Sequence, residues 1–105
     1  MPRTALSLGT AAILQAIASG NRFGFDIMDA TGLTSGTVYP TLDRLETLGL
    51  LVSTWEDPQI AQRDKRPPRR YFSLTAQGGV SLAAALERYK SLRPASGWVA
   101  DLRKA

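Results

Sequence analysis

The stretch GLTSGTVYPTLDRLETLGLL, residues 32–51, contains a helical pattern with a proline inside it. Val38, Leu42 and Leu45 recur at the i, i+4 and i+7 spacing of an amphipathic helix. Pro40 interrupts this pattern. A proline inside a helix removes one backbone hydrogen bond and crowds the carbonyl four residues earlier, at a cost of about 3 kcal/mol. The pattern therefore predicts a helix whose exposed face is shaped by the proline.

Two helices joined by a tight turn are predicted around this stretch. Thr34 is a good N-cap for a helix over residues 35–48, and Gly49 is a good stop signal. The sequence FGFDIMDAT, residues 23–31, predicts a shorter helix before it, and an Ala-rich helix is predicted over residues 5–19. Two helices separated by a short turn containing glycine form a helix-turn-helix, although an ordinary helical hairpin has the same pattern.

A β-hairpin is predicted directly after these helices. The sequences LLVSTWED, residues 50–57, and RRYFSLT, residues 69–75, are rich in the β-branched and aromatic residues that favour strands. Residues 57–68 between them form a polar loop bounded by prolines. A hairpin in this position is the wing of a winged helix, and a last helix is predicted over residues 75–92. The expected fold class is mainly α with a small β-hairpin, a winged helix-turn-helix followed by a C-terminal helix.

Composition excludes several classes of function. The chain has 105 residues, which predicts one domain. It contains no run of about 18 apolar residues that would cross a membrane. It has no histidine and no cysteine, so the usual zinc ligands, the commonest acid–base residue and disulfides are all missing. We therefore expect a cytoplasmic protein that is not an enzyme and has no cofactor, no metal and no membrane partner.

The basic residues are concentrated in the second half of the chain. Residues 57–75 hold five basic and two acidic residues, whereas residues 1–56 hold three basic and five acidic ones. Such a cluster is either a solvated loop or an element that binds phosphates. The predicted phosphate-binding residues are Arg63, Lys65, Arg66, Arg69 and Arg70. For the last two, an alternative is an ion pair with Glu56 or Asp57 across the hairpin.

The run GFDIMDATGLTSGTVYPTLDRLETLGLL, followed by WEDP and RPPRRYFSLTAQG, resembles the PadR family of bacterial transcriptional regulators over roughly residues 5–92. The resemblance implies a winged-helix domain over residues 1–75 that binds double-stranded DNA. It also implies a dimerisation helix over residues 76–105, the two parts forming one compact unit as in the smaller branch of the family. A repressor, acting as a homodimer on an inverted-repeat operator, is the implied function. Some members of the family release DNA when they bind small aromatic effectors.

The helical periodicity identifies the candidate recognition residues. At 100° per residue, Gly36 and Pro40 fall opposite the buried stripe, and the missing Cβ of Gly36 reduces the crowding by the proline. In the PadR pattern this helix enters the major groove, and the tyrosine at position 39 contacts DNA. The predicted contacts are Ser35, Gly36, Thr37, Tyr39, Pro40 and Arg44. The alternatives are a tolerated kink at Pro40 and a half-buried aromatic at the edge of the core for Tyr39.

The C-terminal part carries two further hypotheses. The predicted dimer contacts are Leu82, Leu86, Tyr89 and Leu92, although the same residues suit the core of a single chain. Trp98 lies in a short apolar stripe with Val99 and Leu102. It either borders a pocket for a flat aromatic ligand at the dimer interface or closes the hydrophobic core. The alternative to a DNA-binding regulator is a winged-helix module that binds only other proteins.

Overall fold

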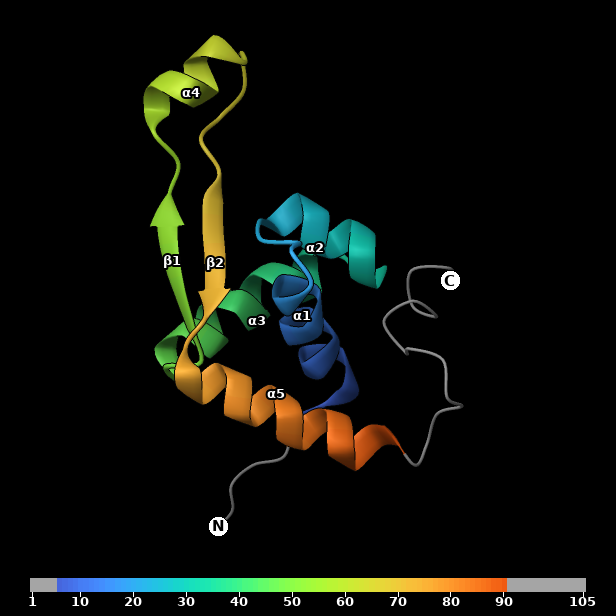
Figure 1. Cartoon of the computed structure of the whole chain (residues 1–105). Coiled ribbons are helices and arrows are strands. Elements are labelled where there is room, and N and C mark those ends of the chain that lie inside the picture. The colour runs from blue at the N-terminus through green and yellow to red at the C-terminus, as the bar shows by residue number, and fades with distance from the viewer. Residues whose placement is uncertain (1–5, 91–105) are drawn as a thin grey trace.

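The computed structural model describes residues 6–90 and confirms the expected fold class (Figure 1). The described elements are α1 (Leu8–Ala18), α2 (Gly24–Thr31), α3 (Ser35–Thr47), β1 (Leu51–Trp55), α4 (Pro58–Arg63), β2 (Arg70–Leu74) and α5 (Ala76–Tyr89). The two strands form an antiparallel hairpin whose register runs from Leu51 opposite Leu74 to Trp55 opposite Arg70. Within residues 6–90, no helix is long and apolar enough to cross a membrane.

The short helix α4 corrects the prediction of a loop over residues 57–68. Asp57 caps this helix, because its side chain accepts a hydrogen bond from the backbone N–H of Gln59 at 2.9 Å. Pro58 occupies the first turn, where its missing N–H costs nothing. Both residues are helix-start signals, but both are also common in turns.

The hairpin projects from a helical body as a long arm. In Figure 1, α1 lies within the body, α2 and α3 pack beside it, and α5 crosses below it. The hairpin arm, which we define as residues 51–74, rises from the body with α4 at its far end. The middle of β2 is fixed to the body where the backbone N–H of Phe72 donates to the carbonyl oxygen of Arg22 at 2.7 Å.

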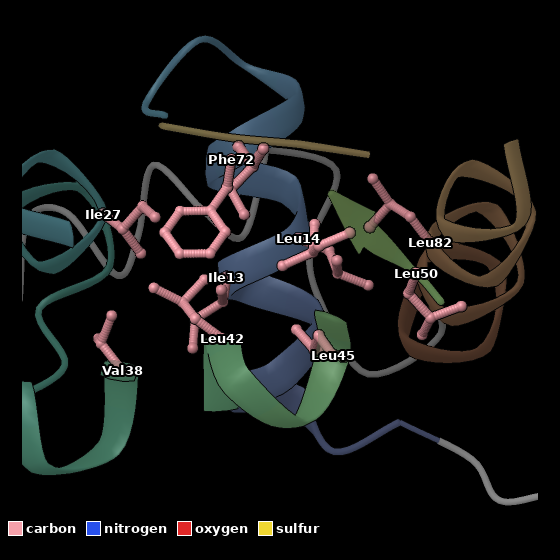
Figure 2. Packing of buried hydrophobic residues seen from close by; sticks show 11 residues of the cluster. Ile13, Leu14, Ile27, Val38, Leu42, Leu45, Leu50, Phe72 and Leu82 are labelled. Carbon is pink, nitrogen blue, oxygen red and sulfur yellow. The ribbon is translucent and has the colours of Figure 1, made fainter. Parts of the chain in front are cut away.

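A single apolar cluster joins the arm to the helices. Ile13 and Leu14 from α1 lie at its centre, and Phe72 from β2 packs over them in Figure 2. The predicted buried stripe of α3 is confirmed, because Val38, Leu42 and Leu45 are at most 1% exposed. These side chains orient α3, so that its opposite face is turned to solvent.

Small residues allow α5 to pack closely on the body. Ala11 and Ala12 of α1 form a second buried cluster with Ala85 of α5. Gly78 of α5 lies against the backbone of Leu50, and a Cβ on this glycine would come within 3.0 Å of the Leu50 carbonyl carbon. The glycine therefore allows a close approach between backbones and does more than weaken the first turn of the helix.

The predicted dimer contacts of α5 face the core of their own chain. Leu82 is buried in the main cluster, Leu86 packs against both clusters, and Tyr89 packs against the second one. The hydroxyl of Tyr89 donates to the carbonyl oxygen of Leu6 at 2.5 Å. This is the arrangement expected from the alternative interpretation, in which these residues complete one chain. Leu92 and Trp98 lie outside the described residues.

Candidate nucleic-acid interface

The outward face of α3 is open to solvent along the whole helix. Thr41 is buried beside the apolar stripe, whereas the other face carries short or polar side chains. Every residue of α3 that was predicted to contact DNA is exposed: Ser35, Gly36, Thr37, Tyr39, Pro40 and Arg44. The structure therefore brings these residues together on one accessible surface, which we call the α3 ridge.

The start of α3 leaves polar groups free for a ligand. Thr34 is the N-cap, as predicted, but its side chain makes no capping hydrogen bond. Its carbonyl oxygen accepts hydrogen bonds from the N–H groups of Thr37 and Val38, at 3.0 and 2.9 Å. The first N–H groups of a helix have no partner inside the helix, and together with the helix dipole they favour an anion such as a phosphate.

Pro40 does not interrupt α3, which continues from Ser35 to Thr47. A Cβ on Gly36 would meet only the hydroxyl of Thr34, at 3.9 Å, apart from the backbone of its own helix. No other element of the described chain therefore covers Gly36. The glycine and the proline form a smooth surface that a partner backbone can approach closely, which supports the interpretation of the ridge as a contact surface.

Tyr39 has features of both predicted roles, a DNA contact and a half-buried aromatic at the edge of the core. Its side chain is 47% exposed, but part of its ring lies against Gly24 at the start of α2. A Cβ on Gly24 would come within 2.5 Å of the ring carbons Cε1 and Cζ of Tyr39. Gly24 was not among the residues predicted from the sequence, because its contact with Tyr39 depends on how α2 and α3 pack.

Two of the five predicted basic residues of the arm are free at its tip. Arg63 and Lys65 are exposed, and neither forms an ion pair with another residue in the range 6–90. Lys65 has a φ of 58°, the left-handed conformation that ends many helices. The N–H groups of Lys65 and Arg66 donate to Gln62 and Ala61 of α4, at 3.0 and 3.1 Å. The end of α4 thus fixes the backbone from which Lys65 projects.

Arg66 is held inside the arm by Glu56. Its two terminal nitrogens donate to the two carboxylate oxygens of Glu56 at 2.7 and 2.8 Å, and the Glu56 side chain is only 7% exposed. The hydrogen bonds from Arg66 lower the pKa of Glu56 from 4.5 to about 2, and the same contact raises the pKa of Arg66. The predicted alternative for Glu56 is corrected, because its side-chain partner is Arg66; Arg69 contributes only a backbone N–H, at 3.1 Å.

Arg70 connects the arm to α3. Its guanidinium forms an ion pair with Glu46 and a longer one with Asp43, at 3.6 Å. Its Nε donates to the hydroxyl of Ser53 at 3.0 Å, and that hydroxyl donates to Glu46 at 2.7 Å. Arg70 therefore pairs with acidic residues of α3 and not with Glu56 or Asp57. Its role in this structure is to fix the orientation of the arm relative to the α3 ridge.

Arg69 and Arg22 connect the hairpin to the segment just before α2. The guanidinium of Arg69 lies 4.1 Å from the centre of the Phe23 ring, and Tyr71 meets the same ring edge-on at 5.6 Å. The Nε of Arg22 donates to the carbonyl oxygen of Phe72 at 3.2 Å. Arg22 was not predicted from the sequence, since an isolated arginine after a predicted helix gives no signal of a long-range contact.

Fewer basic side chains of the described surface are free to bind phosphates than the sequence predicted. Three of the five basic residues predicted to bind phosphates, Arg66, Arg69 and Arg70, have partners inside the chain. In residues 6–90, no group of three or more His, Cys, Asp or Glu side chains is placed to hold a metal ion. The arrangement suits contacts with a surface of spaced negative charges.

Comparison with known proteins agrees with this arrangement. Residues 13–84 match the transcriptional regulator PadR-like family. Among solved structures, a PadR-like transcription factor from Bacteroides fragilis is 26% identical, with a TM-score of 0.66 over 79% of this chain and 81% of that one. The protein smu.1704 from Streptococcus mutans UA159 is 25% identical, with a TM-score of 0.68 over 88% and 84%. A PadR family transcription regulator from Clostridium difficile R20291 shares the fold at 21% identity, with a TM-score of 0.70 over 82% and 91%. No curated protein sequence matches this chain.

Proposed function

Because the chain belongs to the PadR-like family of transcriptional regulators, we propose that it recognises a specific sequence of double-stranded DNA. The observation that carries this proposal is the α3 ridge, an exposed surface on a helix whose opposite side is fully anchored in the core. A major groove admits an α-helix, and hydroxyl-bearing side chains can read base edges there. In this proposal Thr37 and Tyr39 contact bases, and Gly36 and Pro40 allow the helix to approach them. A cytoplasmic location is part of this proposal, since that is where its DNA target would lie.

The tip of the hairpin arm is proposed to supply affinity without sequence preference. Arg63 and Lys65 are the basic residues of the arm that are free to meet phosphates. Each phosphate contact contributes about 0.9 to the slope of log K against log salt concentration. Arg66 and Arg70 are proposed to act through structure, by holding the arm in position, and this replaces the prediction that they bind phosphates directly.

We further propose that the protein acts as a homodimer on an inverted repeat. Two α3 ridges related by a two-fold axis require half-sites about one helical turn apart, roughly 10 bp. Because Leu82, Leu86 and Tyr89 face their own core, the two-fold contact is assigned to the exposed back of α5. Ala76, Gly79 and Ala83 lie there, and small residues let two helices approach closely. Light scattering should report twice the chain mass, and a monomer at micromolar concentration that still binds its operator tightly would contradict the dimer.

The proposed biological outcome is repression, relieved by a small aromatic effector. A dimer bound over a promoter excludes the polymerase, and an effector that binds the free form better than the DNA-bound form shifts the equilibrium toward release. The hypothesis that Trp98 borders the effector site falls on residues outside the described part of the chain. A panel of planar aromatic compounds, titrated against the protein–operator complex, would test for release.

Footprinting on the DNA upstream of its own gene, followed by salt titrations, tests the proposal. Arg63→Ala should weaken binding to operator and random DNA alike and reduce the salt slope by about 0.9 for each phosphate that the variant no longer neutralises. Tyr39→Phe should chiefly reduce the preference for the operator. A protein that shows no salt-dependent DNA binding would contradict the proposal and favour a winged-helix module that binds proteins.

A further inference from the structure

An apolar groove runs between α5, the end of α3 and the start of α1. Leu45, Leu50 and Ala85 form its buried floor. Two large apolar side chains on its walls face solvent: Leu48 is 61% exposed and Val80 is 63% exposed. The residues that line this groove do not include Ala76, Gly79 or Ala83, which form the back of α5 to which the two-fold contact is assigned.

The charged residues that line the groove are both arginines. The guanidinium of Arg44 approaches the hydroxyl of Thr41 at 3.5 Å, and that of Arg88 lies 5.7 Å from the centre of the Tyr89 ring. Neither forms an ion pair with another residue between positions 6 and 90. The groove therefore suits an occupant that has an apolar face and a carboxylate beside it.

The sequence after α5 contains such a segment. Residues 91–105 hold one acidic residue, Asp101, and three large apolar residues beyond Pro94. At helical spacing, Trp98, Asp101 and Leu102 occupy positions i, i+3 and i+4, which lie on one face. Val99 extends the apolar part of this face. The segment thus has both an apolar face and a carboxylate beside it, the two properties that suit the groove.

The chain is long enough to bring this segment back to the groove. One wall of the groove is α5 itself, which reaches Arg88 two residues before Lys90, the last described residue. Val80 lies about 15 Å back along the helix from Lys90, at 1.5 Å per residue. Residues 91–97 can span up to about 25 Å, and Pro94 disfavours continuation of the helix. A tether of this length gives an effective concentration in the millimolar range.

We propose that residues 98–102 dock in the groove of the same chain. Trp98 and Leu102 cover Leu48 and Val80, and the carboxylate of Asp101 pairs with Arg88. This intramolecular contact goes beyond the proposed function and does not depend on DNA binding. It places the C-terminal segment beside Arg44, the member of the α3 ridge that also lines the groove.

Disulfide trapping tests the proposal directly, because the sequence has no cysteine of its own. In the full chain, Val80→Cys is combined with Val99→Cys and oxidised at about 10 µM protein. A tethered segment at about 1 mM should form an intramolecular disulfide about 100-fold faster than two separate chains form an intermolecular one. The matched control combines Val99→Cys with Val52→Cys, at an exposed valine on β1 outside the groove. Equal rates for the two pairs, or only an intermolecular disulfide, would overturn the proposal.

Tryptophan emission gives a second readout that needs no cysteine. A Trp55→Phe background leaves Trp98 as the only tryptophan. Docked Trp98 should be quenched by acrylamide several-fold less than a solvated tryptophan. Val80→Asp should restore that quenching, whereas Val52→Asp should not. Unchanged, solvent-like quenching in all three proteins would show that Trp98 does not enter the groove.

Discussion

Replacing Gly24 by alanine should displace the ring of Tyr39 and weaken operator binding. The new Cβ would lie within 2.5 Å of ring carbons Cε1 and Cζ, whereas carbon atoms in contact sit about 3.5–4.0 Å apart. The ring must therefore move by roughly 1–1.5 Å. Hydrogen-bond distances vary over only about 0.5 Å, so such a movement breaks the base contact proposed for the Tyr39 hydroxyl. A good base contact contributes about 1–3 kcal/mol of discrimination, which corresponds to roughly 5- to 150-fold in affinity.

A double-mutant cycle separates this effect from a general loss of structure. Gly24→Ala, Tyr39→Phe and the double variant are titrated against operator and random DNA. Each single variant should bind the operator more weakly, and the double variant should be little weaker than either, because both changes remove the same hydrogen bond to a base. Gly9→Ala in α1 is the matched control, since its Cβ would meet only the side chain of Leu33, at an ordinary contact distance of 3.9 Å. Full operator affinity for Gly24→Ala, or additive effects in the double variant, would refute the reasoning.

The remaining predictions concern stability. Gly78→Ala should lower the free energy of unfolding by about 1–3 kcal/mol because its Cβ would overlap the Leu50 carbonyl; thermal melts measure the loss. The pKa of Glu56 is lowered from 4.5 to about 2, so its contribution is fully present above about pH 4.5 and is lost as the pH falls toward 2. In acid titrations Glu56→Gln should melt below the wild type at pH 6, and the gap should close toward pH 2; a constant gap would count against the ion pair. Lys65→Gly should relieve the left-handed backbone and raise stability by up to about 1 kcal/mol, yet weaken DNA binding at low salt; unchanged binding would remove Lys65 from the interface.

The helices that the sequence predicted are those whose signals are local. Periodicity and end signals lie within a single segment, so α3 and its buried stripe could be recognised from Val38, Leu42 and Leu45 alone. The helix α4 has only six residues, too few for an apolar periodicity to appear. Its start signals, Asp57 and Pro58, are also ordinary turn residues, and this ambiguity explains the wrong prediction of a loop.

The roles of the arm cations could not be read from the sequence, because they depend on distances across the fold. Arg63 and Arg66 are both arginines of the same basic cluster, so the sequence does not distinguish them. In the described structure only Arg66 comes within hydrogen-bond distance of Glu56. Arg70 reaches Glu46 only because the hairpin packs beside α3. The same limit applies to Gly24, whose importance appears once the ring of Tyr39 is seen against it.

The shared carboxylate of Glu46 has a mechanical consequence for any DNA that binds here. Arg70 from β2 and the hydroxyl of Ser53 from β1 both engage this one residue of α3, so the arm and the α3 ridge cannot swivel independently. The distance between the α3 ridge, which would enter the major groove, and the tip of the arm, which would meet the DNA phosphates, is then set before the DNA binds. A duplex whose groove width or bend does not match that spacing must itself deform, at an energy that depends on its sequence. Under the proposed function, the contacts of Arg70 and Ser53 with Glu46 thus let this small protein discriminate between operators at base pairs that none of its side chains touches.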